Sequence, residues 1–162
     1  NTVGCGICQL ELGYQYTYDS DTTSSHINHS YPQSLLRIGT LADWFELRVA
    51  WSMEQQTDRV FGVSSHTDVG SDDMNVGFKI ALTPQDGCRP QMGIVADMFV
   101  PSGSSAFTAG EVLPEVEWIY EWALTKKLSV TGVTFATCAV DNVTNDSFLD
   151  ISQVLEPCPQ LP

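Results

Sequence analysis

Apolar and polar residues alternate with a period of two along most of the chain. In the segment 116–124, VEWIYEWAL, the charged residues Glu117 and Glu121 share one side. The opposite side carries Val116, Trp118, Tyr120, Trp122 and Leu124. Such alternation is typical of a β-strand with one apolar and one polar face. The same pattern recurs in the segments 11–19, 34–40, 44–54, 74–82, 91–100, 128–140 and 147–156. The sequence therefore predicts an all-β, antiparallel chain of about eight strands.

The connections between these segments alternate between long and short. The long ones are polar and cover 20–33, 55–71 and 101–113. The short ones cover 40–43, 83–90 and 125–127. An up-and-down meander whose two ends differ in this way is typical of outer-membrane barrels, which have short turns at one end and long loops at the other. We expect a single domain over 1–162, with an N-terminal extension at 1–9 and a Pro-rich tail at 157–162.

The two faces of the predicted strands indicate which one lies inside. The polar face mixes charges of both signs with Gly39, Gly77 and Gly93, and small residues with paired charges suit a narrow, crowded lumen. The apolar face is bulky enough to overfill the lumen of an eight-stranded barrel. We therefore expect a closed barrel of the outer-membrane type with its apolar face toward lipid. A soluble barrel or sandwich with this face inside remains the alternative.

This interpretation assigns two sets of candidate residues. The lumen and selectivity candidates are Arg37, Glu46, Arg48, Lys79, Asp97, Glu117 and Glu121. The lipid-facing aromatic candidates are Tyr14, Tyr16, Phe45, Trp51, Phe78, Trp118, Tyr120 and Trp122. The lumen charges would set what passes through the barrel.

Composition narrows the choice of partners. The 162 residues include 20 Asp and Glu against 7 Lys and Arg, a formal net charge of −13. This excess argues against binding nucleic acid, whose phosphates need Lys and Arg. The expected partner is the lipid bilayer of an outer membrane, and a homo-oligomer is possible. The chain has no apolar run of about 18 residues, so it encodes no transmembrane helix.

Few residues in the sequence suggest a redox, metal or catalytic site. Cys5 and Cys8 form a CGIC spacing, which indicates a redox or half-zinc motif, a possible local disulfide, or two free thiols. The missing second half of a metal site favours the disulfide or the free thiols over the motif. His26, His29 and His66 could form a metal site, but exposed loop histidines are the simpler interpretation. Asp68, Asp72 and Asp73 lack the spacing of a calcium loop, which favours solvated acidic residues. We expect no enzyme, no metal and no cofactor.

Several segments together resemble a known family. They are LELGYQYTYD, QSLLRIGTLADWFELRVAW, SDDMNVGFKIALTPQDGCRPQMGIVADMFVPSGSSAFT and VLPEVEWIYEWALTKKLSVTG. Their combination, over about Leu10 to Gln153, resembles the bacterial outer-membrane β-barrel family of MetA-pathway phenol-degradation transporters. Members of that family are generally longer and continue with further strands. The chain is therefore expected to be either a short relative or one without its last strands.

The resemblance implies a function. Members of the family are similar to channels for small apolar or aromatic compounds, so we expect a passive transporter in the bacterial outer membrane. The first alternative is a secreted structural or self-assembling β protein, such as a surface filament or an interaction subunit, which would be extracellular. The second is a soluble β-barrel that binds a small ligand.

Overall fold

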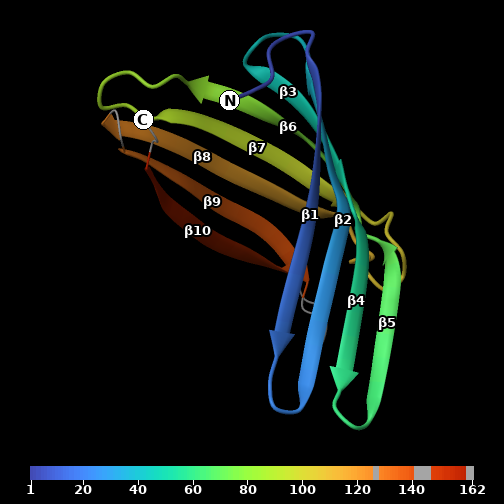
Figure 1. Ribbon diagram of the computed structural model, residues 1–162. Helices are drawn as coiled ribbons and strands as arrows, with labels where there is room; N and C mark the ends of the chain where they lie inside the picture. Colours follow the sequence, from blue (N-terminus) through green and yellow to red (C-terminus); the bar gives the residue numbers. More distant parts are fainter. Residues whose placement is uncertain (126–127, 141–146, 160–162) are drawn as a thin grey trace.

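The computed structural model describes residues 1–125, 128–140 and 147–159, and these form one antiparallel sheet (Figure 1). The sheet has ten strands. They are β1 (Cys8–Ser20), β2 (Ser24–Gly39), β3 (Phe45–Trp51), β4 (Met53–Val60), β5 (Ser64–Ser71), β6 (Met74–Thr83), β7 (Gln91–Val100), β8 (Leu113–Thr125), β9 (Leu128–Val140) and β10 (Ser147–Pro159). The described residues contain no helix long and apolar enough to cross a membrane. The predicted all-β, antiparallel class is confirmed.

The sheet divides at β2. This strand of 16 residues pairs with β1 on one side. On its other side, its first half pairs with β4 and its second half pairs with β3. From β3 the order continues through β6, β7, β8 and β9 to β10, whereas β4 leads only to β5. The strands β1, β2, β4 and β5 therefore project as a long arm beyond the rest of the sheet (Figure 1).

The prediction of about eight strands was wrong, because the structure has ten. Two predicted loops, 20–33 and 55–71, are largely strand: β2 already begins at Ser24, and the β4–β5 hairpin occupies most of the second loop. These segments are polar on both faces, and polarity alone does not distinguish a solvated strand from a loop. The interruptions at Ser52 and at Asp72–Asp73 separate β3 from β4 and β5 from β6.

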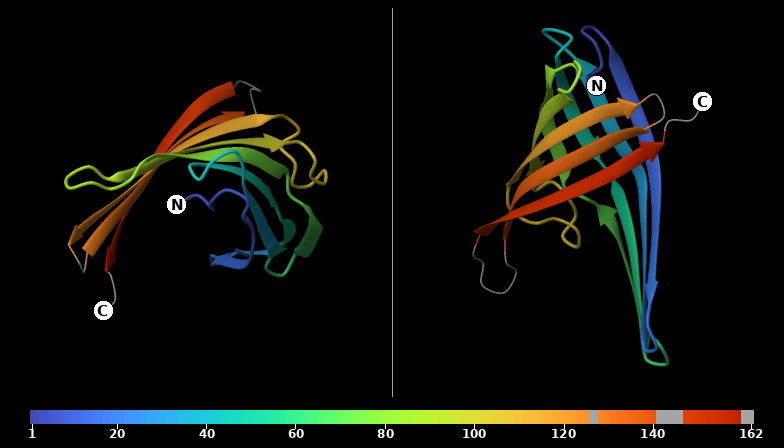
Figure 2. Two further views of the ribbon diagram at one scale, coloured as in Figure 1. Left: turned by 90° about the horizontal axis from the view of Figure 1, so that it is seen from above. Right: turned by 90° about the vertical axis from the view of Figure 1, so that its left-hand side faces the viewer.

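The sheet is an open arch and not the predicted closed barrel. Viewed from above, it curves strongly but leaves a wide opening (Figure 2). Strand β1 pairs only with β2, and β10 pairs only with β9, within the described residues. The alternation of side chains is the same in an open and a closed sheet, so the sequence pattern did not distinguish them.

The two faces of the arch have opposite character. We call the concave face, which carries Arg37, the inner face, and the convex face, which carries Trp118, the outer face. The N-terminal residues before β1 lie inside the arch (Figure 2), where Asn1 contacts Arg37. On the outer face Trp118 is 47% exposed, whereas Glu46 on the inner face is fully buried. Soluble antiparallel sheets usually show the reverse arrangement.

Large apolar side chains therefore lie mostly on the surface. Among the described residues, only Val3 and Val95 are buried hydrophobic residues. Leu10, Leu12, Leu149 and Ile151 are at least 60% exposed. A single sheet without a second layer cannot cover its apolar face with its own residues.

Candidate functional site on the inner face

The centre of the inner face is a buried ion pair between neighbouring strands. Arg37 of β2 donates from Nε to Glu46 Oε1 over 2.8 Å and from Nη2 to Glu46 Oε2 over 2.9 Å. Arg48 Nη1 lies 3.5 Å from Glu46 Oε1, and Glu11 accepts from Arg37 Nη1 over 2.9 Å. Two-point contacts of this kind fix the position of both side chains. Burial of the Glu46 carboxylate is thus compensated by charge and hydrogen bonds together.

The N-terminal segment completes this network. The amide of Val3 donates to Glu46 Oε2 over 2.7 Å, and the carbonyl of Asn1 accepts from Arg37 Nη2 over 2.8 Å. The close approach depends on Gly39, because a Cβ at that position would lie only 1.9 Å from the carbonyl oxygen of Gly4. Sequence reasoning treated this segment as an extension and missed its place on the inner face. The glycine on the polar face of its strand was the available signal.

Most of the predicted lumen charges lie in two adjoining cross-strand rows. One row runs through Glu46, Lys79, Val95 and Glu117 on β3, β6, β7 and β8. The other contains Arg37, Arg48 and Asp97. Glu46 and Lys79 are directly paired opposite charges, which attract one another. Arg37 and Arg48 are paired like charges, and Glu46 contacts both of them. Glu121 lies on the same face, further along β8, and is exposed. The structure thus gathers these residues on the inner face, and their role in selectivity stays a prediction.

The predicted lipid-facing aromatic residues share the outer face. Phe45 and Phe78 stack with ring centroids 5.8 Å apart, and Trp118 lies 5.3 Å from Tyr120. The register places Trp51 on this face. Tyr14, Tyr16 and Trp122 follow from the alternation along β1 and β8. Whether these aromatic residues meet lipid stays a prediction.

The histidines lie in strands and not in loops as expected. His26 and His66 lie on either side of Asp58 in one cross-strand row, with His26 Nδ1 2.6 Å from Asp58 Oδ1. His29 lies on the opposite face, where Nδ1 is 2.8 Å from the Tyr14 hydroxyl. The three histidines therefore do not come together in one metal site. The described residues include no group of three or more His, Cys, Asp or Glu that could hold a metal ion.

The predicted pair Cys5 and Cys8 does not form a site either. Cys5 and Cys8 are exposed free thiols, so the possible disulfide between them is not formed in this structure. Cys88 is a free thiol as well.

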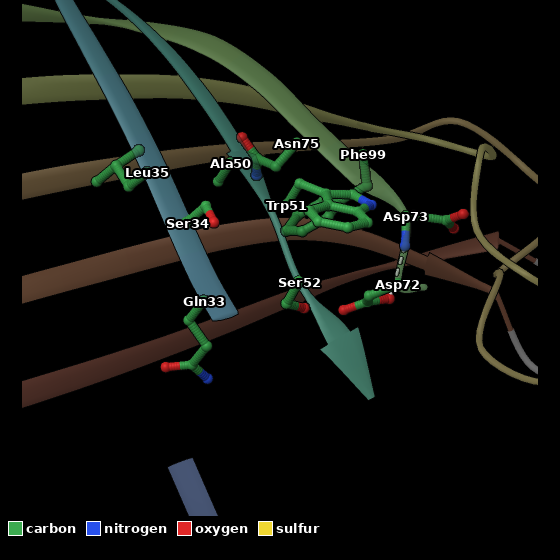
Figure 3. A pocket seen from close by; sticks show the side chains of 10 residues that line it. All are labelled: Gln33, Ser34, Leu35, Ala50, Trp51, Ser52, Asp72, Asp73, Asn75 and Phe99. Atoms are coloured by element: carbon green, nitrogen blue, oxygen red, sulfur yellow. Dashed lines mark hydrogen bonds between the residues drawn. The ribbon is translucent and has the colours of Figure 1, made fainter. Parts of the chain in front are cut away.

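A hollow opens where the sheet divides. It has a volume of about 250 Å³ and is lined by apolar residues, including Leu35, Trp51 and Phe99, and by polar ones, including Asp72 and Asn75. Figure 3 shows the Trp51 indole among the side chains that line the hollow, with Phe99 and Asp72 drawn on either side of it. The mixture of aromatic walls and a few polar groups is typical of a small-molecule site.

Asp73, beside this hollow, anchors the β7–β8 loop. Its Oδ1 accepts from the amides of Ser102 and Gly103 over 3.0 and 2.8 Å, and its Oδ2 accepts from the amide of Ala109 over 2.9 Å. Burial alone would raise the pKa of Asp73, but these hydrogen bonds hold its pKa below the usual value. Asp73 is only 7% exposed, so the expectation of a solvated acidic residue was wrong here.

Asp72 has a different environment. Its Oδ1 accepts from the amide of Asp73 over 2.8 Å. Burial, assisted by repulsion from Glu54 and Asp73, raises the pKa of Asp72. In the part of the chain that the structure describes, Asp72 Oδ2 accepts no hydrogen bond. An acceptor is therefore free at the edge of the hollow.

Comparison with known proteins gives one family. A family model described as "Putative MetA-pathway of phenol degradation" matches residues 1–152. Comparisons with curated proteins and with solved structures find no match.

Proposed function

The chain belongs to the family described as "Putative MetA-pathway of phenol degradation", and from this premise we propose that it forms the wall of an outer-membrane β-barrel for small apolar or aromatic compounds. The family name links the chain to phenol degradation, and the sheet supplies the β-structure that a barrel wall needs. Transport through the barrel is passive. The proposed location is the bacterial outer membrane.

The observation that carries this proposal is the reversed burial in the first half of β8. Val116 and Trp118 on the outer face are 46% and 47% exposed, whereas Glu115 and Glu117 on the inner face are less exposed. In water, this exposure of apolar surface is unfavourable. In a bilayer the same arrangement is favourable, because the apolar face meets lipid and the charges face the interior.

A membrane location requires the arch to close. The free edges of β1 and β10 expose unpaired backbone groups, and a bilayer offers them no hydrogen bonds. We propose that these edges gain partners on insertion, either from further strands or from a second copy of the chain. The closed barrel then surrounds the inner face with a continuous wall.

The inner face defines what the barrel accepts. Arg37, Glu46 and the N-terminal segment form a rigid polar region, and Asp97, Glu117 and Glu121 add negative charge nearby. Charged linings set the selectivity of pores. Neutral compounds avoid the cost of moving a charge past this lining, so they are the compounds that the proposed barrel passes.

The first experiment measures tryptophan quenching in lipid vesicles. The purified protein is refolded into vesicles whose acyl chains are brominated at defined depths. Strong, depth-dependent quenching is expected, because Trp118 and Trp122 lie on the outer face. Conductance across a planar bilayer then tests passage. Absence of quenching would show that the outer face is covered by protein, and the membrane proposal would be abandoned.

A second candidate function rests on the same free edges. Unpaired strand edges are sites for pairing with other chains, so a secreted, self-assembling β protein also fits this sheet. Sedimentation in detergent-free buffer distinguishes the two. Soluble, regular assemblies without lipid quenching favour self-assembly, whereas a requirement for detergent favours the membrane barrel.

A further inference from the structure

The arm has a free strand edge that closure of the barrel at β1 and β10 does not use. Strand β5 pairs with β4 on one side, and no described strand pairs with its other side. This other side forms the outer margin of the arm (Figure 1). Unpaired strand edges are sites for pairing with another chain, so the β5 edge is a candidate interaction surface.

The uncovered part of the β5 edge has defined ends. At one end the β7–β8 loop covers the strand: the amide and the hydroxyl of Ser104 donate to the carbonyl of Ser71 over 2.9 and 3.2 Å. At the other end β5 begins at Ser64, after the turn that follows Val60. The open stretch is therefore 64–70, and Thr67 is its middle residue.

The contact at Ser71 also shows which backbone groups point outward. The Ser71 carbonyl meets the loop, so it points away from β4. Backbone groups point to alternate sides along an antiparallel strand, and β5 pairs with β4 residue for residue from Ser64 to Ser71. The N–H and C=O groups of Ser65, Thr67 and Val69 therefore also point toward the open edge, where another strand can pair with them.

The arm is polar on its outer face as well as on its inner face. Thr57 and Arg59 of β4 lie on the outer face, and Thr57 Oγ1 lies 3.0 Å from Thr67 Oγ1 of β5. An arginine on this face is unfavourable in hydrocarbon. In the proposed barrel the arm therefore extends out of the bilayer, and the β5 edge lies in water.

We propose that the β5 edge binds the β5 edge of a second copy of this chain, antiparallel, with a two-fold axis at Thr67. In this register Thr67 lies opposite Thr67 of the second copy, and Ser65 lies opposite Val69 of the second copy. All the outward-pointing backbone groups of the open stretch then have partners. The register also uses the whole open stretch and ends where the β7–β8 loop begins to cover the strand.

The side chains select the same register. His66 lies opposite Asp68 of the second copy, and Asp68 lies opposite His66 of the second copy, so two complementary cross-strand pairs form. Within one copy these two side chains already approach to 3.0 Å. A two-fold axis at His66 or at Asp68 would instead place two identical side chains opposite each other, which is unfavourable for the carboxylates.

The symmetry fixes the direction of the joined molecules. An antiparallel pair of identical strands is related by a two-fold axis perpendicular to the sheet, so the two arms point in opposite directions. The two barrel walls then lie at opposite ends of the joined arms. Together with the proposed function, on which this step rests, the contact joins molecules in two facing bilayers and not neighbours in one bilayer.

Cysteine cross-linking of the full chain refolded in detergent tests the register. The five native cysteines are first replaced by serine. Thr67→Cys should then give a disulfide-linked dimer, because the Cα atoms of opposite residues in a hydrogen-bonded pair lie about 5.5 Å apart. Ser65→Cys is the matched control, since it is also exposed on the same face of β5. Its two copies lie about 14 Å apart in this register, so it should link about tenfold less.

An exchange of the paired side chains gives a second test. His66→Asp places carboxylates opposite each other, and Asp68→His leaves imidazoles opposite each other. Each variant alone should dimerise about tenfold more weakly than the unaltered chain. An equimolar mixture restores both pairs between unlike copies, so its affinity should return. Sedimentation equilibrium in detergent measures these affinities, and recovery in the mixture distinguishes a specific register from a folding defect.

Vesicle clustering tests the joining of two bilayers. Phosphatidylcholine vesicles that carry the unaltered protein should cluster, as measured by light scattering. Vesicles with Thr67→Pro should stay dispersed, because proline removes an outward-pointing N–H and leaves the pairing with β4 intact.

Four results would change these conclusions. Equal linking at Thr67 and Ser65, or no recovery in the mixture, would overturn the contact. Lipid quenching and conductance from a protein that does not link at Thr67 would retain the proposed function and lose the contact. Linking at Thr67 without lipid quenching would retain the contact and overturn the membrane function. Vesicles that stay dispersed although the protein links at Thr67 would overturn the joining of two bilayers.

Discussion

At the scale of single residues, Glu46 illustrates how this sheet places a charge inside. The carboxylate is fully buried, yet Arg37 contacts both of its oxygens and the Val3 amide adds a further hydrogen bond. Glu11 also pairs with Arg37, but its side chain is 44% exposed. Buried and exposed members of one network differ strongly in their contribution to stability.

This difference gives a prediction for two matched substitutions. Glu46→Gln removes the charge that compensates Arg37, so the free energy of unfolding should fall by about 3 kcal/mol. Glu11→Gln should lower it by less than about 1 kcal/mol, because solvent screens the exposed pair. Urea unfolding of the detergent-refolded variants measures both values. Equal effects would contradict the assignment of Glu46 as the centre of the network.

Asp73 gives a prediction that depends on pH. Its folded-state pKa lies below the unfolded value of about 3.9. The carboxylate therefore stabilises the docked loop above the unfolded pKa, and this contribution is lost as the pH falls through the lowered pKa. Asp73→Asn offers one acceptor oxygen to three amides, and docking of the loop should weaken by about 2–3 kcal/mol.

Hydrogen exchange of the loop checks this prediction. The amides of Ser102, Gly103 and Ala109 should exchange faster in Asp73→Asn than in the unaltered protein. Asp72→Asn is the matched control, because Asp72 accepts from the amide of Asp73 and not from the loop. Similar exchange in both variants would show that the loop is held by other contacts.

At the scale of elements, β8 presents its apolar side outward and its carboxylates inward. The pattern in VEWIYEWAL does not indicate which of the two sides faces inward, because an alternating strand has the same period in water and in lipid. The pairing with β7, and through it with β6 and β3, places Glu117 in the row of Lys79 and Glu46. The orientation of the strand therefore follows from its neighbours.

An arginine placed on either face of β8 gives a third prediction. Val116→Arg puts a cation on the outer face, so insertion into vesicles should become about 2–4 kcal/mol less favourable if this position lies near the bilayer midplane. Glu121→Arg changes an exposed inner-face residue and should have little effect on insertion. Folding yield into vesicles, followed by gel mobility, compares them. Equal yields would indicate that Val116 does not meet lipid.

At the scale of the whole molecule, the open arch has two separated edges at β1 and β10 (Figure 2). Few apolar residues are buried within the described part, so little of the sheet's stability comes from a protein core. Closure and lipid contact would supply hydrogen bonds and apolar burial that this single layer lacks.

Closure is testable through the edge amides. In the arch, half of the β1 amides point away from β2 and have no strand partner. After insertion into vesicles, these amides and those on the free side of β10 should become strongly protected from hydrogen exchange. The amides of β7, which pair on both sides, serve as the internal reference. Rapid exchange at one edge of the inserted protein would contradict closure.

The sequence by itself determined the all-β class and the two contrasting faces, because these follow from a local period of two. The predicted up-and-down order of strands was not obtained, since β3 pairs with β6 and β2 pairs with β4. The sequence also identified the charged set that the structure gathers on the inner face. Only the tertiary structure decided the division at β2, the open arch, the N-terminal segment on Glu46 and the loop held by Asp73. These features depend on contacts between residues far apart in the chain. Alternation along one strand carries no information about such contacts.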